Sequence, residues 1–189
     1  MINNIKKVLV YFRRTRNRIY GKIQLAKVAE HCGEIFIGGK GRTNLTKTTH
    51  LGKNVNFNGM IIKGYGHVYI GDNFHSGENC RIITSNHNYE GTKIPYDETF
   101  ITKDVVIENN VWLGDNVIIL GGVKIGEGAI IQAGSVVTKD IEKYGIAGGH
   151  PAIIFKYRDA KHYEDLKANQ LFHWYEYIYF SHKSSFNSS

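Results

Sequence analysis

Residues 101–142 read ITKDVV IENNVW LGDNVI ILGGVK IGEGAI IQAGSV VTKDIE, and this stretch repeats every six residues. The first place of each unit is apolar and is filled by Ile101, Ile107, Leu113, Ile119, Ile125, Ile131 and Val137. The fifth place is mostly small or β-branched, while Gly, Asp and Asn concentrate between the apolar places. Short extended segments bounded by turn-forming residues are typical of strands joined by tight turns. The stretch therefore predicts strand and turn in repeated alternation.

A period of six residues matches neither the 3.6-residue period of a helix nor a hairpin ladder. It suits a chain that winds around a prism, so that each coil stacks on the one before and hydrogen bonds run between coils. A parallel sheet crossed by helices is the alternative, but no helical period separates these strands. The predicted fold class is an all-β solenoid, a parallel β-helix, with helical appendages at both ends.

The same rhythm is looser upstream, in LGKNVN at 51–56 and in IGDNFH, SGENCR and IITSNH from 70 to 87. The distance from Ile82 to Ile101 is 19 residues, one more than a multiple of six, so the register slips there. The slip coincides with the polar, irregular segment ITSNHNYEGTKIPYDETF at 83–100. We expect residues 88–100 to form a loop that leaves the coil directly after His87.

Composition limits the class of protein. The chain has 189 residues, of which 42% are hydrophobic, and this is enough for one domain with a sizeable core. Its two cysteines, Cys32 and Cys80, exclude a disulfide scaffold and a zinc-cysteine site. No apolar run approaches the roughly 20 residues that span a bilayer, and no signal peptide is recognisable. These features predict a soluble, cytoplasmic protein.

Positive charge is concentrated near the N-terminus. The formal net charge is +7, but residues 1–50 alone carry +9. A basic segment of this kind can bind nucleic acid, an anionic membrane or a phosphorylated ligand. The sequence has no RNP-like, zinc-finger or recognition-helix signature, so nucleic acid is not predicted as a partner.

Five features of the sequence resemble the hexapeptide-repeat acetyltransferases, within them the branch of sugar O-acetyltransferases and xenobiotic acetyltransferases. They are the repeats, the loop that begins at His87, NNVWLG at 109–114, AGSVVTKDI at 133–141 and AGGHPA at 147–152. The resemblance covers residues 34–158. It implies a left-handed β-helix, acetyl-CoA as co-substrate, and a homotrimer with active sites between subunits. The acceptor would be a small molecule or a glycan, and no metal is expected.

His87 matches the catalytic histidine of this family. An alcohol is a poor nucleophile at neutral pH, so acetyl transfer to a hydroxyl needs a base, and an imidazole is well suited to that task. The resemblance implies that His87 is the general base. It also implies that Asn56 and Asn58 face the acceptor, although asparagines in β-helix turns are an equally good interpretation. Tyr89 is a further candidate for acceptor binding.

The resemblance also implies a donor site. The amides near Gly114, Ala133 and Ser135 would bind the pantetheine arm, and Thr138 and Lys139 would continue that track. Trp112 would line the coenzyme A tunnel, unless it packs on a neighbouring subunit. The cations expected near the adenosine phosphate are Lys139, Lys143, Lys156 and Arg158. The sequence departs from the family at Ile153, where relatives usually carry a lysine.

The two ends lie outside the resemblance. We expect residues 1–33 to form a basic helical arm, with an apolar face at Ile2, Ile5, Leu9 and Phe12. Residues 2–18 either pack on the trimer or lie on the inner face of a membrane. Residues 159–189 are expected to form a helix and a disordered tail. The aromatic segment LFHWYEYIYF at 171–180 should be buried against the coil or a neighbouring subunit.

The predicted function is that of an acyltransferase, an acetyl-CoA-dependent O-acetyltransferase that acts on a sugar hydroxyl in cell-surface polysaccharide synthesis. Acetyl transfer to a sugar amine or to an antibiotic is the nearest alternative. A different class would be a metal-dependent hydratase of γ-carbonic-anhydrase type or a non-catalytic scaffold. That metal site needs three histidines, two of them five residues apart, whereas His67, His75 and His87 are separated by eight and twelve. The spacing therefore argues against the metal site.

Overall fold

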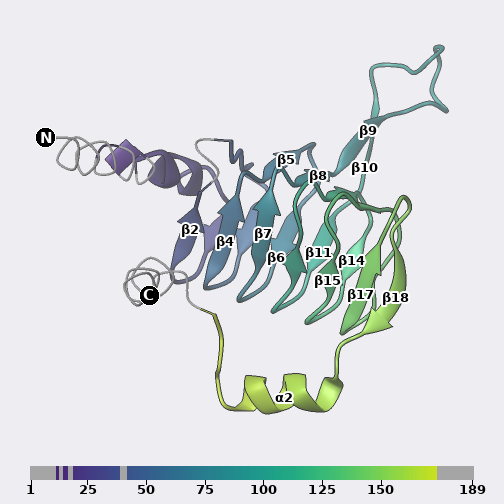
Figure 1. Ribbon diagram of the computed structural model, residues 1–189. Helices are drawn as coiled ribbons and strands as arrows, with labels where there is room; N and C mark the ends of the chain where they lie inside the picture. The colour runs from purple at the N-terminus through teal and green to yellow at the C-terminus, as the bar shows by residue number, and fades with distance from the viewer. Residues whose placement is uncertain (1–11, 13–14, 17–18, 39–41, 174–189) are drawn as a thin grey trace, which may run out of the picture.

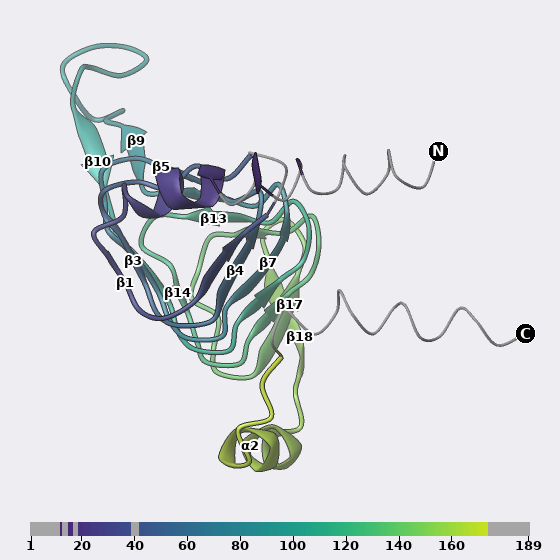
Figure 2. The same cartoon turned by 90° about the vertical axis from the view of Figure 1, so that its left-hand side faces the viewer.

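The computed structural model describes residues 12, 15–16, 19–38 and 42–173. Within these residues the chain winds as a three-sided parallel β-helix (Figures 1 and 2), which confirms the predicted fold class. We name the three faces sheet A, sheet B and sheet C, in the order in which each coil passes through them.

Sheet A contains β1 (Glu30–His31), β3 (Thr49–Leu51), β6 (Val68–Ile70), β11 (Val105–Ile107) and β14 (Lys124–Ile125). Sheet B contains β2 (Ile35–Ile37), β4 (Val55–Asn58), β7 (His75–Glu78), β12 (Trp112–Leu113), β15 (Ile130–Ile131), β17 (Gly145–Gly148) and β18 (Ile153–Tyr157). Sheet C contains β5 (Ile61–Lys63), β8 (Arg81–Ile83), β13 (Ile118–Leu120) and β16 (Val136–Val137). All of these pairings are parallel except that of β17 with β18, which folds back as a hairpin at the end of the coil.

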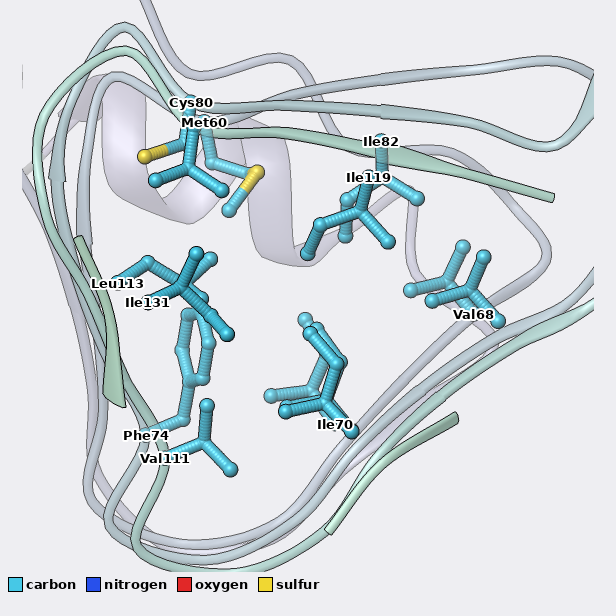
Figure 3. Close-up of a cluster of buried hydrophobic side chains, with 14 of the residues drawn as sticks. Met60, Val68, Ile70, Phe74, Cys80, Ile82, Val111, Leu113, Ile119 and Ile131 are labelled. Atoms are coloured by element: carbon cyan, nitrogen blue, oxygen red, sulfur yellow. The ribbon is translucent and has the colours of Figure 1, made fainter. Parts of the chain in front are cut away.

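The core consists of columns of side chains that point to the inside of the prism. Figure 3 shows Leu113 stacked on Ile131 and Ile82 stacked on Ile119, each pair contributed by successive coils. Both the first and the fifth place of the six-residue unit point inward, since Val117 and Ile119 are both fully buried. The six-residue period therefore exists because two places per unit fill the core while the others form the corners and the outer face.

Asparagines in a left-handed conformation form the corner between sheets A and B. Asn54, Asn73 and Asn110 have φ angles of 55°, 56° and 61°, a region that Asn tolerates better than most side chains. Their side chains form a ladder across coils, from Asn54 Nδ2 to Asn73 Oδ1 at 2.9 Å and from Asn73 Nδ2 to Asn110 Oδ1 at 2.8 Å. The turn residue of each coil thus also binds the next coil.

The irregular segment forms an arm at the corner between sheets C and A. The chain leaves the coil after Ile83 and returns at Val105, and β9 (Ser85–His87) pairs with β10 (Phe100–Thr102) in antiparallel fashion. One detail differs from the sequence prediction. Ile101 lies in β10 of this arm, so the first of the seven units contributes only its end to the coil. A sequence period cannot show where the outgoing and returning chains begin to pair with each other.

Helical segments lie at both ends of the coil. Residues 19–25 are helical, and Tyr20 and Leu25 pack on the core next to the buried Gln24. At the other end, α2 (Ala160–Ala168) begins after Asp159, whose side chain accepts a hydrogen bond from the backbone of His162. The chain then runs back along the corner, where Asn54 Nδ2 donates to the carbonyl oxygen of His173 at 3.0 Å.

Two expectations for the ends fall outside the described residues. They are the apolar face at Ile2, Ile5 and Leu9, and the aromatic segment together with the tail beyond His173. In the part of the chain that the structure covers, no helix is long and apolar enough to cross a bilayer.

Candidate active site

His87 is the last residue of β9, at the base of the arm and directly opposite Phe100 of β10. Its imidazole stacks on the ring of Tyr96, with 3.9 Å between centroids and 15° between planes. The centroid of the Phe100 ring lies 4.7 Å from that of the imidazole, with 34° between the planes. Neither ring nitrogen of His87 is hydrogen-bonded to any described residue. The imidazole is thus held by its faces, and its two nitrogens remain available.

A buried carboxylate organises the loop that carries Tyr96. Asp97 accepts hydrogen bonds from the Thr99 hydroxyl at 2.5 Å and from the backbone N–H groups of Thr99 and Thr92 at 2.9 and 3.0 Å. These bonds, above all the one from the Thr99 hydroxyl, lower the pKa of Asp97. Lys93 and Glu98 add an ion pair at 2.5 Å. Asp97 and Glu98 therefore stabilise the loop itself and form no hydrogen bond with His87.

A row of polar and aromatic residues crosses the outer face of sheet B. Asn56 pairs with His75, and His75 pairs with Trp112, so the three lie side by side at strand spacing. Asn56 is 4% exposed, and its Oδ1 atom is buried without a hydrogen-bond partner among the described residues. Trp112 is 52% exposed. Asn58 differs from Asn56, because its side chain donates to the Ser76 carbonyl at 2.9 Å and thus links two successive coils.

His75 is half-buried in the middle of this row. Burial lowers its pKa, and the nearby His173 contributes a further lowering. An imidazole with a lowered pKa is neutral at physiological pH and can both donate and accept a hydrogen bond. His75 therefore adds an uncharged, polar group between the buried Asn56 and the exposed Trp112.

The residues predicted to bind the pantetheine arm of the acetyl donor lie at the corner between sheets B and C, and they differ in whether their N–H groups are already hydrogen-bonded. The N–H groups of Ala133 and Ser135 donate to no acceptor among the described residues. The N–H of Gly114 donates to the Ile131 carbonyl at 2.8 Å, and a Cβ atom at Gly114 would lie 2.6 Å from the Ala133 nitrogen. The amide of Gly114 is therefore engaged in the coil, and its lack of a side chain permits close stacking. The Ser135 side chain is buried and donates to the Gln132 carbonyl.

The four cations expected around the adenosine phosphate do not form one cluster. Lys143 lies near the corner between sheets A and B, where it pairs with Glu127 at 3.2 Å and Glu164 at 3.1 Å. Arg158 donates to the Gly128 carbonyl there and lies over the ring of Tyr163. These two charges therefore stabilise the attachment of α2 to the coil, which the sequence alone did not indicate.

The other two cations remain exposed, but on different sides. Lys156 lies in β18 at the end of sheet B, and Lys139 lies with Thr138 at the corner between sheets C and A. Ile153, which replaces the usual lysine, is 68% exposed at the start of β18.

A single chain does not bring the candidate base and the candidate binding face together. His87 is on the arm at the corner between sheets C and A, whereas Asn56 and Trp112 are on sheet B, the side that does not border this corner (Figure 2). The arm also points away from its own coil, and Tyr89 on it is 71% exposed. Any site that uses both groups must therefore combine the arm of one chain with sheet B of another.

The three histidines considered for a metal site, His67, His75 and His87, lie on different parts of the coil. His67 lies beside sheet A, His75 in sheet B and His87 on the arm. Within the described ranges, no three His, Cys, Asp or Glu side chains are placed so that they could hold a metal ion.

Comparison with known proteins decides the family. Residues 104–139 match the family model described as bacterial transferase hexapeptide (six repeats). A Schizosaccharomyces pombe protein that is named as an acetyltransferase is 32% identical over 162 residues, which cover 79% of this chain and 78% of that protein. The chain belongs to the hexapeptide-repeat acetyltransferases. The left-handed parallel β-helix is the fold of this family.

Two further relatives of this hexapeptide-repeat acetyltransferase carry more specific names. Galactoside O-acetyltransferase of Escherichia coli is 38% identical over 109 residues, which cover 57% of this chain and 53% of that protein. A solved galactoside acetyltransferase in complex with coenzyme A has a TM-score of 0.60 at 28% identity and covers 70% of this chain and 66% of that one. The match spans about half the length of the galactoside O-acetyltransferases.

Sequence reasoning missed two features of this hexapeptide-repeat acetyltransferase. One is the position of His75 in the row on sheet B, which could have been found by aligning successive coils, because the register places it between Asn56 and Trp112. The other is the stacking of Tyr96 on His87, which no repeat predicts, because the arm does not follow the period of the coil.

Proposed function

We propose that this protein is an acetyl-CoA-dependent O-acetyltransferase that transfers an acetyl group to a sugar hydroxyl. The likeness to galactoside O-acetyltransferase supports the reaction and the class of acceptor. The placement of His87 at the base of the arm, with both ring nitrogens available, is the observation that carries the proposal.

In this mechanism His87 is the general base. A ring nitrogen takes the proton from the sugar hydroxyl while the hydroxyl oxygen attacks the thioester carbonyl carbon. The new C–O bond forms, the C–S bond breaks, and the proton passes from the imidazolium to the departing sulfur. The products are the acetylated sugar and the free thiol of coenzyme A.

The donor fits the corner between sheets B and C. The amides of Ala133 and Ser135 offer two donors for the carbonyl oxygens of a pantetheine arm. Apart from Gly134 itself and its two chain neighbours, no described residue has an atom within 4 Å of a Cβ atom placed on Gly134, so the surface is open at this point. Trp112 supplies an exposed aromatic wall. The candidates for contacts with the phosphates and the pantetheine arm of the donor are Thr138, Lys139 and Lys156. Gly114 contributes to this site by permitting close stacking of the coils, because its amide is already hydrogen-bonded.

The acceptor fits the row on sheet B. The Oδ1 of Asn56 is buried without a partner among the described residues, and an unsatisfied buried acceptor is costly, so a sugar hydroxyl that displaces the atoms covering it and donates to it would gain affinity. Tyr89 on the arm could cover the sugar from the neighbouring subunit. Asn58 is a weaker candidate because its side chain already binds Ser76.

The functional unit is a homotrimer in this proposal. The arm and sheet B lie on different sides of one chain. A closed ring of three copies would bring the arm of each next to sheet B of the following one. Each of the three sites then takes its base from one subunit and its binding face from the next. Sedimentation velocity measures this state directly, and a fully active monomer would contradict it.

The cellular setting is the synthesis of a surface polysaccharide in the cytoplasm, at the inner face of the membrane. The net charge of +9 over residues 1–50 favours an anionic surface. In the helical segment 19–25, Ile19 and Ile23 lie one turn apart and are 56% and 53% exposed. Co-sedimentation with anionic and neutral vesicles tests this setting. Binding to neither kind of vesicle, or to both equally, would contradict it.

The reaction itself is tested by thiol release from acetyl-CoA in the presence of a panel of sugars. We expect release with at least one glycan acceptor, and His87→Ala should lower kcat by about 10² to 10⁴ without changing the oligomeric state. His162→Ala, an exposed histidine on α2, is the matched control and should keep full activity. Equal rates for His87→Ala and the wild type would remove His87 from the mechanism. Amino sugars and chloramphenicol in the panel distinguish N-acetylation and antibiotic acetylation.

A further inference from the structure

The contacts of His87 raise the question of what holds its ring in place. Histidines that act as bases are commonly oriented by a hydrogen bond to the second ring nitrogen. Here the described residues provide no such bond, and the contacts are the ring of Tyr96 at 3.9 Å and the ring of Phe100 at 4.7 Å. Within one chain, orientation therefore comes from the ring faces.

Phe100 is fixed by the coil. It lies in β10 directly opposite His87 in the antiparallel pair, and its ring meets Tyr65 edge-on at 5.3 Å. Tyr65 belongs to the preceding coil, where its backbone N–H donates to the Ser85 hydroxyl at 2.9 Å. One aromatic contact of the imidazole is therefore anchored to the solenoid.

Tyr96 is fixed by the loop. The next residue is Asp97, whose carboxylate accepts three hydrogen bonds from Thr92 and Thr99. A Cβ atom at Gly91 would lie only 2.0 Å from a carboxylate oxygen of Asp97, so the loop closes tightly around this side chain. The loop thus places the Tyr96 ring on the imidazole from the side of the tip, while the Tyr96 hydroxyl forms no hydrogen bond with a described residue.

We propose that Tyr96 is a positioning residue that holds the His87 imidazole by parallel stacking and stabilises it when it carries a proton. The parallel arrangement restricts rotation of the imidazole and keeps both nitrogens at the edge of the stack. During the reaction His87 becomes an imidazolium, and the electron-rich face of a tyrosine attracts a cation. This inference rests on the proposed function, because it assigns a partner to the base named there.

Three substitutions at Tyr96 separate aromatic stacking from simple packing. Tyr96→Phe keeps the ring, Tyr96→Leu keeps an apolar side chain of similar bulk without the ring, and Tyr96→Ala removes both. We expect Tyr96→Phe to retain kcat, and Tyr96→Leu and Tyr96→Ala to lower kcat by about 10- to 100-fold, because a misplaced base loses rate steeply. KM for acetyl-CoA should stay unchanged. Ile94→Ala, at a side chain of the same loop that is 99% exposed, is the control and should keep both constants.

A second readout does not depend on activity. In protein labelled with 13C-histidine, His87→Ala identifies the His87 resonance, which should be displaced by the ring current of Tyr96. The displacement should persist in Tyr96→Phe and decrease in Tyr96→Leu and Tyr96→Ala, where only the ring current of Phe100 remains. Sedimentation and thermal unfolding of each variant check that trimer and fold are intact.

The two readouts keep this inference distinct from the proposed function. If His87→Ala is inactive while Tyr96→Leu matches the wild type, the base stands and the positioning role of Tyr96 is wrong. If Tyr96→Leu leaves the His87 resonance in place, the stack does not exist in solution. If His87→Ala is fully active, the proposed base is wrong, and with it the catalytic purpose of the stack. A lower kcat together with a smaller ring-current shift, with rescue by Tyr96→Phe, supports the inference.

Discussion

Single residues of this protein have properties that depend on their place on the prism more than on their type. Asn56 and Asn58 are two residues apart in one strand, yet Asn56 has an unpartnered, buried oxygen and Asn58 binds the coil. Likewise, the predicted amide donors differ, because Gly114 is engaged and Ala133 is not. The family resemblance implied the same task for both members of each pair, and only contacts with the neighbouring coil distinguish them.

The protonation of His75 should make stability depend on pH. Its pKa in the folded protein is lowered by burial and by His173, whereas in the unfolded chain it has the ordinary value of 6.5. Above about pH 6.5 both states are neutral, so His75 has no effect. As the pH falls below that value the unfolded chain binds the proton first, so stability decreases until the lower folded pKa is reached. His75→Gln should therefore lose less stability on acidification than the wild type.

Thermal unfolding midpoints of both proteins between pH 7.5 and 5.5, in one buffer series, measure this difference. His173→Gln serves as the comparison and should remove only part of the pH dependence, because burial is the larger cause. Parallel curves for wild type and His75→Gln would contradict the lowered pKa.

At the scale of elements, the corners hold the coils together. The Asn ladder runs along the corner between sheets A and B and continues into α2, because Asn110 Nδ2 donates to the Tyr163 hydroxyl at 2.6 Å. At its other end Asn54 binds the carbonyl of His173. The C-terminal segment is thus fastened to a row of turn residues that belong to three different coils. This explains why a nine-residue helix with one buried residue stays attached to the solenoid.

Substitution of Asn73 in the middle of the ladder separates its two functions. Asn73→Gly keeps the left-handed φ of 56° but removes two ladder hydrogen bonds, and we expect a loss of about 1–3 kcal/mol. Asn73→Ala removes the same bonds and adds roughly 1–2 kcal/mol of backbone strain. Denaturant unfolding of the two variants measures the difference. Equal stability of the Gly and Ala variants would show that the left-handed turn carries no strain.

At the scale of the whole molecule, the arm and sheet B lie on different sides of one chain. The corner between sheets C and A and the face of sheet B do not adjoin, so the coil keeps His87 of one chain away from Asn56 and Trp112 of the same chain. This separation makes assembly a condition of activity in the proposed mechanism. It also means that two defects in different subunits can compensate each other.

Mixing two inactive variants should restore activity. His87→Ala keeps an intact sheet B, and Asn56→Ala keeps an intact arm. When the two are unfolded together in equal amounts and refolded, random trimers place an intact arm beside an intact face in about a quarter of the sites. Thiol release should recover to roughly that fraction of the wild-type rate. No recovery in mixed trimers, whose formation is verified by differently tagged subunits, would show that base and binding face act within one chain.

The sequence by itself determined the solenoid, because a six-residue period is local information. The sequence of each unit indicates which two side chains point inward and where the chain turns, and the buried Val117 and Ile119 are examples of such side chains. The coils stack because these apolar columns have to be buried. It also located the insertion through the register slip after Ile82. For the candidate site it named His87, Asn56 and Trp112 from resemblance.

Only the tertiary structure decided which of these groups can meet. Lys143 and Arg158 were expected at the donor site but bind around α2, because a helix outside the repeat brought Glu164 and Tyr163 to that corner. The Tyr96 ring was found on His87 because the loop folds around Asp97, an arrangement without period. A repeat fixes contacts between equivalent places of successive coils, whereas the arm and the C-terminal helix make contacts between unlike residues. Contacts between unlike residues follow no period, so they become visible only in the folded chain.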